Sequence, residues 1–100
     1  MKIVITDFAE AKLKEIFLYY KREATLTIAK KIKRKIFNKI KLTIDNPLIG
    51  TEDNYLKHLS LGHRNLIEGN YKIVYRLSDN IIYITDIFDS RQDPDKQSIK

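Results

Sequence analysis

The amino-acid sequence predicts an α+β fold of two layers, in which a helical hairpin packs on a mainly antiparallel four-stranded sheet. Two consecutive segments between residues 8 and 45 carry apolar residues at the spacing of amphipathic helices. Three segments after residue 63 alternate or are continuously apolar, as strands are, and two short turns join them. Strands joined by such turns are antiparallel neighbours. With 100 residues, 43% of them hydrophobic, the chain suffices for a single domain, residues 1–100, in the order β-α-α-β-β-β.

The first strand and the first helix are predicted over residues 2–22. Lys2 to Thr6 is a short, apolar, β-branched run, which is typical of a buried strand. Asp7 precedes Glu10 by three residues, the spacing of a capping box at the start of a helix. We expect the helix to run from Phe8 to Arg22. Its apolar face consists of Ala9, Leu13, Ile16, Phe17 and Tyr20.

A second helix is expected after a turn at residues 23–25. Thr25 or Thr27 can cap its start, and Asn46-Pro47 ends it because proline cannot continue a helix. Its apolar face comprises Ile28, Ala29, Ile32, Ile36, Ile40 and Ile44. Its other side carries seven cations, Lys30, Lys31, Lys33, Arg34, Lys35, Lys39 and Lys41. These cations either bind an acidic partner or form a solvated face whose lysine stems cover apolar surface.

Three strands are predicted after a polar connection. Residues 51–60 form this connection, with Tyr55 and Leu56 as anchors on the core. Gly69-Asn70 is typical of a two-residue hairpin turn. In the strand after it, Tyr71, Ile73 and Tyr75 alternate with Lys72, Val74 and Arg76, and residues 78–80 form the next turn. The last strand, from Ile81 to Phe88, is apolar nearly throughout, which indicates an internal strand or one that is covered on both sides.

Composition restricts the function. A net charge of +6 favours an acidic partner, such as nucleic acid, a ribosome or an acidic protein. The absence of cysteine excludes disulfides and thiolate chemistry, and the three glycines lack the spacing of a phosphate-binding loop. His58 and His63 have no third partner that would indicate a metal site. Because no signal peptide or membrane-spanning run is present, we expect a cytoplasmic protein. Because the motifs above are missing, we expect no metal or cofactor.

Cations gather along the predicted strands. Lys72 and Arg76 should lie on one face of a strand, about 13 Å apart. The turn at residues 69–70 should bring Arg64 close to Arg76, and Arg91 follows the last strand. Such a surface could bind a phosphate backbone or cleave RNA. Alternatively, Arg64 and Arg76 pair with nearby acids, namely Glu68, Asp86, Asp89 or Asp93.

Three short motifs identify a family resemblance. Arg64-x-Leu66, the run from Gly69 to Arg76 and the ending from Phe88 to Pro94 resemble the RelE/ParE superfamily of toxins from type II toxin–antitoxin systems. Chain length, basicity and element order agree with it. The resemblance implies a toxin that a cognate antitoxin neutralises. In the RelE-like branch the toxin cleaves mRNA on the ribosome, whereas in the ParE-like branch it blocks DNA gyrase.

The resemblance also assigns roles to residues. In a nuclease, Lys72 and Arg91 would be the catalytic, phosphate-binding residues. The nuclease branch normally has a tyrosine or histidine in its C-terminal segment, but here none follows Tyr83, and Asp89 stands where many relatives have histidine. His63 is a possible substitute. The missing proton carrier favours a ParE-like toxin that binds gyrase through Arg64, Tyr71, Arg76 and Asp89, with a ribosome-dependent endoribonuclease as the alternative. A third hypothesis is a small binding domain that has lost its toxicity and retains only the antitoxin interface.

The antitoxin is expected to be an acidic or amphipathic segment that folds on binding. It is expected to lie on the helical hairpin or on a sheet edge, and the basic second helix offers a counter-surface through Lys30, Lys33 and Arg34. The complex of the two proteins is expected to be hetero-oligomeric.

Overall fold

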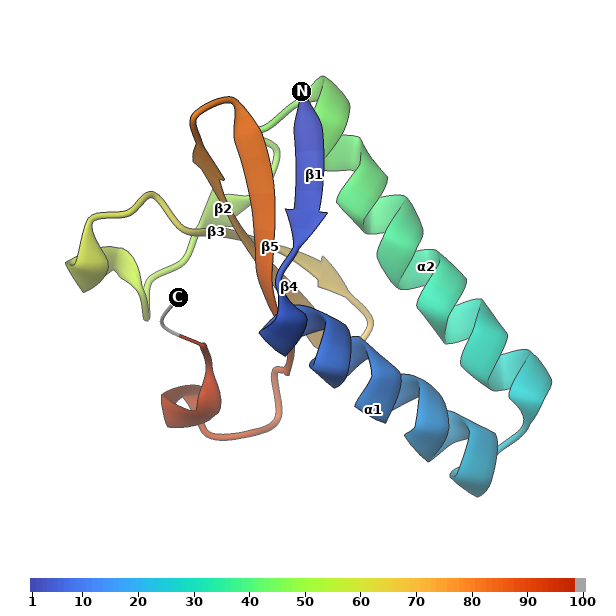
Figure 1. Cartoon of the computed structure of the whole chain (residues 1–100). Coiled ribbons are helices and arrows are strands. Elements are labelled where there is room, and N and C mark those ends of the chain that lie inside the picture. The colour runs from blue at the N-terminus through green and yellow to red at the C-terminus, as the bar shows by residue number, and fades with distance from the viewer. Residues whose placement is uncertain (99–100) are drawn as a thin grey trace.

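The computed structural model describes residues 1–98 and has the two predicted layers (Figure 1). Its elements are β1 (Lys2–Ile5), α1 (Asp7–Glu23), α2 (Leu26–Asp45), β2 (Thr51–Glu52), β3 (Arg64–Glu68), β4 (Tyr71–Ser78) and β5 (Ile81–Asp89). Short 3₁₀ turns lie at Lys57–Leu59 and Pro94–Lys96. Both helices lie on one side of the sheet, while the connection before β3 and the C-terminal segment lie on the other. Among the described residues, no helix is long and apolar enough to span a membrane.

The sheet has five strands rather than the predicted four, in the order β1-β5-β4-β3-β2. The additional strand, β2, has two exposed residues within a polar stretch, so no hydrophobic pattern marks it. It pairs with the start of β3. β1 pairs in parallel with β5, and the other strand pairs are antiparallel. The first strand of the chain therefore borders the last.

A β-bulge in β5 determines which of its side chains face the helices. Val74 pairs with Asp86 and Tyr75 with Ile84, so Thr85 is the extra residue. Its hydroxyl donates to the Val74 carbonyl at 3.4 Å. The extra residue shifts the alternation of side chains along the strand. Ile82, Ile84 and Ile87 all join the core as a result, whereas Asp86 and Phe88 point to the other face.

The starts of both helices are capped by threonines. The predicted capping box at Asp7 is wrong, because Thr6 is the cap: its hydroxyl accepts from the Ala9 amide at 3.2 Å. Asp7 already lies in the first turn of the helix, where its negative charge interacts favourably with the positive end of the helix dipole. For α2 the cap is Thr25, one of the two predicted candidates, and it accepts from the Ile28 amide.

The buried side of α2 is rotated from the predicted apolar face. Ala29, Ile36 and Ile40 are buried as predicted, but Ile28 and Ile44 are 41% and 43% exposed. Thr43 lies in the core instead, where its hydroxyl donates to the Ile40 carbonyl at 2.6 Å. A threonine can replace an apolar residue there because that bond satisfies its hydroxyl within the helix.

Tyr75 fixes the turn after α2 to the sheet. Its hydroxyl donates to the Pro47 carbonyl at 2.8 Å and accepts from the Gly50 amide at 2.9 Å. Arg64 donates to the Gly50 carbonyl at 2.7 Å. A buried tyrosine hydroxyl needs such partners. The interaction explains why Gly50 lies so close to β3 and β4.

Candidate functional site

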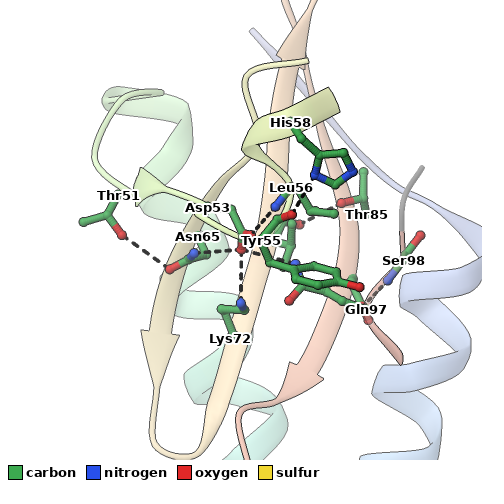
Figure 2. A network of polar contacts seen from close by, with 12 residues as sticks. Thr51, Asp53, Tyr55, Leu56, His58, Asn65, Lys72, Thr85, Gln97 and Ser98 are labelled. Carbon is green, nitrogen blue, oxygen red and sulfur yellow. Dashed lines mark hydrogen bonds and ion pairs between the residues drawn. The ribbon is translucent and has the colours of Figure 1, made fainter. Parts of the chain in front are cut away.

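A polar network closes the outer face of the sheet, the face that points away from the helices. Its centre is Asp53, which is fully buried. One of its oxygens lies 3.1 Å from the Lys72 ammonium and accepts from the side-chain amides of Asn65 and Gln97. The other accepts from the Leu56 backbone amide (Figure 2). Although burial opposes ionisation, these donors hold the pKa of Asp53 below its ordinary value.

The C-terminal segment completes this network. The Ser98 amide donates to Asp86 at 2.9 Å, and Tyr55 donates to Asp95 at 2.7 Å. Leu56 is a buried anchor, as predicted. Tyr55 is only half-buried and holds the C-terminal segment rather than the helix-side core. Sequence reasoning missed this role of the segment, because polar residues after the last strand carry no periodic signal.

The network changes the role of Lys72. Lys72 and Arg76 share the outer face, as predicted: the two cations lie 5.7 Å from the Phe88 ring centre and 5.2 Å from that of Tyr83. The Lys72 side chain is only 19% exposed and is paired with Asp53. It therefore acts as the counter-ion of a buried carboxylate.

The predicted approach of Arg64 to Arg76 is wrong. Arg64 pairs with Tyr75 across the ladder, so its side chain shares the helix side of the sheet with Tyr75. Arg76, one residue later in β4, points to the outer face. Because the two side chains point to opposite faces, the sheet lies between their guanidinium groups. The role predicted for both in target binding stays a prediction.

A pocket of about 580 Å³ lies between α1 and the end of β5. We call it the α1–β5 pocket. Helix α1 contributes Lys12, Glu15, Tyr19 and Arg22, among others. The sheet contributes Tyr71 and Asp89, and Arg91 follows from the turn after β5. Three predicted site residues therefore meet here, whereas Lys72, Arg64 and Arg76 do not line the pocket.

Arg91 is held by Asp89. Its side chain donates two hydrogen bonds to the two carboxylate oxygens, at 2.9 and 2.7 Å, and its backbone amide donates a third at 3.0 Å. The guanidinium lowers the pKa of Asp89, so the carboxylate stays ionised. This pairing was not predicted, since the acids were expected to pair with Arg64 and Arg76, and Arg64 donates to the Gly50 carbonyl instead. The bidentate pair fixes the orientation of an arginine that remains 61% exposed.

Tyr71 is mostly buried behind the pocket. Its hydroxyl donates to the Tyr20 hydroxyl at 3.2 Å, and Tyr20 packs edge-on against Tyr19. Burial and the Tyr20 hydroxyl raise the pKa of Tyr71. A proton carrier would need a pKa closer to neutrality, so Tyr71 is poorly suited to acid–base chemistry.

His63 is equally unsuited to replace the missing proton carrier. It is 2% exposed and does not line the pocket that contains Arg91. Neither ring nitrogen has a hydrogen-bond partner among residues 1–98. Burial and the Arg76 cation lower its pKa, against the weaker opposing effect of Asp53. The ring is therefore neutral in the folded protein near pH 7.

A second concave surface, the hairpin groove, lies between α1 and α2. It consists of two adjoining pockets of about 500 and 340 Å³ that share Phe17, Lys33 and Phe37. Lys33 lies over both aromatic rings, 5.4 and 6.0 Å from their centres. Lys30 and Arg34 line the larger pocket, so the three predicted antitoxin-binding residues meet here. The aromatic floor was missed, although Phe37 follows Lys33 by one turn in the sequence.

Comparisons with known proteins agree with this fold. The model of a family described as the ParE toxin of the type II toxin–antitoxin system parDE matches residues 3–94. One solved structure, from the chromosomal ParDE toxin–antitoxin system of P. aeruginosa, superposes with a TM-score of 0.73 at 23% identity. The match covers 87% of this chain and 92% of that one. No curated protein matches significantly. Because the family model spans nearly the whole sequence, the chain belongs to the ParE toxin family of type II toxin–antitoxin systems.

Proposed function

We propose that this toxin acts by binding DNA gyrase and blocking it, without cleaving mRNA. The observation that carries the proposal is the state of the two cations that a nuclease would need. Lys72 is paired with buried Asp53, Arg91 is paired with Asp89, and Lys72 does not line the α1–β5 pocket that contains Arg91. A scissile phosphate would need both cations together, along with a proton carrier that Tyr71 and His63 are poorly suited to provide.

Two assays run side by side test this proposal. Purified toxin is added to gyrase in a DNA supercoiling assay and to ribosomes carrying mRNA in a cleavage assay. We expect inhibited supercoiling and intact mRNA. Cleavage of ribosome-bound mRNA that disappears in Arg91→Ala, with supercoiling unaffected, would contradict the proposal. A toxin that leaves growth unimpaired when induced without antitoxin would have lost its activity. Gyrase is cytoplasmic, so the proposal also places the toxin in the cytoplasm.

The antitoxin, in this proposal, binds in the hairpin groove. The groove combines an aromatic floor with cations from α2, including Lys30, Lys33 and Arg34. An amphipathic segment with acidic residues would complement it, because its apolar side can cover Phe17 and Phe37 while its carboxylates meet the cations. A disordered segment that folds on binding is suited to such an extended surface.

Charge reversal tests the groove. The double variant Lys33→Glu/Arg34→Glu should weaken antitoxin binding by roughly 30-fold, the effect of losing an interface hot spot, because the new carboxylates repel an acidic partner. Titration calorimetry with purified antitoxin measures the change. Lys31→Glu/Lys39→Glu is the matched control, since it changes the charge of the same helix equally but outside the groove. Equal losses in the two variants would show that only net charge matters, against a defined groove.

A further inference from the structure

The α1–β5 pocket and the hairpin groove lie on opposite sides of one helix. Successive residues of an α-helix are about 100° apart, so positions three, four and seven residues apart share a side. The groove takes Leu13, Lys14 and Phe17 from one side of α1. The pocket takes Lys12, Tyr19 and Arg22 from the other. Among the described residues, none of α1 lines both surfaces.

The lining of the pocket has the composition of a protein-binding hot spot. Leu18 and Tyr19 are 45% and 49% exposed, although large apolar side chains usually lie against a core. The Arg22 and Arg91 side chains are 68% and 61% exposed. Tyrosine and arginine dominate binding hot spots, and an arginine whose orientation is already fixed loses less entropy on binding. Asp89 provides that fixed orientation for Arg91.

The charges of the pocket favour a protein carboxylate over a nucleic acid. Binding to a phosphate backbone depends on several unneutralised cations that release counter-ions. Here Glu15 and Asp89 stand among the cations and would repel successive phosphates. A single carboxylate carries one charge and needs only one or two cations, and Arg22 and Arg91 remain largely exposed although Glu23 and Asp89 pair with them. Such a carboxylate can meet Arg22 and Arg91 while an apolar neighbour covers Tyr19 and Leu18.

We propose that the α1–β5 pocket binds an acidic segment of the target protein and stays open when the antitoxin occupies the hairpin groove. This inference rests on the proposed function, which assigns the groove to the antitoxin and gyrase as the target. Because α1 separates the two surfaces, one toxin molecule can hold both partners. The antitoxin can then reach a toxin that is already bound to its target.

A pair of reciprocal variants tests the separation. Tyr19→Ala/Arg22→Glu changes exposed side chains of the pocket, and Lys33→Glu/Arg34→Glu changes the groove. The pocket variant should lose roughly 30-fold in gyrase binding and keep its antitoxin affinity within about twofold. The groove variant should show the reverse. Circular dichroism and thermal melts verify that both variants fold.

The ternary complex is tested on immobilised gyrase. Wild-type toxin is bound first, and antitoxin is then added while the bound mass is followed. We expect the mass to rise. A fall, as the antitoxin removes the toxin, would overturn the inference, and so would a pocket variant that binds gyrase like wild type. The inference would also be overturned if Tyr19→Ala/Arg22→Glu lost binding to free DNA but still bound gyrase. If wild-type toxin does not bind gyrase at all, the proposed function itself fails.

Discussion

Asp53 and His63 are buried at the two ends of the connection between β2 and β3, where the Asp53 backbone amide donates to the His63 carbonyl at 2.9 Å, and both have shifted pKa values. Asp53 stays ionised because it accepts hydrogen bonds from several donors, whereas His63 stays neutral because it is buried near the Arg76 cation. The first keeps a charge for Lys72 to neutralise. The second avoids placing a further positive charge beside Arg76.

His63 makes the stability of the protein dependent on pH. Its pKa is lowered in the folded state, so the unfolded chain binds a proton more readily. Its stabilising effect is complete above the unfolded pKa of about 6.5 and is lost as the pH falls below it. Urea unfolding between pH 7.5 and 5 should therefore show a falling free energy of unfolding. The lowered pKa of Asp53 adds a separate loss only in more acidic solution.

Two histidine variants identify the source of this slope. His63→Leu should flatten it between pH 7.5 and 5, because the titrating ring is gone. His58 is exposed, so His58→Asn should leave the slope as in the wild-type protein. A slope that persists in His63→Leu would assign the effect to other groups.

At the level of elements, the close passage of the segment after α2 over the sheet depends on Gly50. A Cβ atom there would lie 2.7 Å from the Asn65 carbonyl oxygen and 2.8 Å from the Tyr75 ring. Gly50→Ala should lower the free energy of unfolding by about 2 kcal/mol, a typical cost of overpacking, because backbone on one side prevents relaxation. Chemical denaturation measures the loss.

Gly62 provides the comparison for Gly50. A Cβ atom at Gly62 would meet nothing within 4 Å, but the φ of 76° at this position is strained for any residue that has a side chain. Gly62→Ala should therefore cost about 1 kcal/mol, from backbone strain alone. If Gly50→Ala proved as mild, the close contact would not determine the stability of this turn.

The elements also show what the sequence could predict. The helices and β4 were predictable because their apolar residues repeat with a regular period, and β5 because it is apolar nearly throughout and follows a turn. The pairing of β1 with β5 and the bulge at Thr85 depend on contacts between distant residues, and no local pattern contains them. The bulge alone decides that Asp89 faces the α1–β5 pocket while Asp86 faces outward. This is why the sequence identified Tyr71, Asp89 and Arg91 but not the pocket that unites them.

For the molecule as a whole, the C-terminal segment stabilises the outer face although part of it lies beyond the family pattern. The family model ends at residue 94, while Asp95, Gln97 and Ser98 make the contacts to Tyr55, Asp53 and Asp86. These contacts join the last strand to the connection before β3. The segment therefore stabilises two regions that are distant in the sequence.

Removal of the segment is a direct test. Deletion of residues 95–100 should lower the free energy of unfolding by about 3 kcal/mol, because the three hydrogen bonds to Tyr55, Asp53 and Asp86 are lost and each contributes about 1 kcal/mol. The far-ultraviolet circular dichroism should remain, and hydrogen exchange should increase in residues 53–58. Lys96→Ala, at an exposed position, is the control. An unchanged denaturation midpoint after the deletion would contradict the stabilising role.

The parallel pairing of β1 with β5 has a consequence for how the toxin is made. Lys2 is aligned with Ile81, so the first strand pairs with a segment that lies far along the chain. Contacts this distant in sequence form late and slow the folding of the whole domain. The first strand therefore cannot pair until β5 has been synthesised, and the α1–β5 pocket, which takes Ile87 and Asp89 from β5, can form only then.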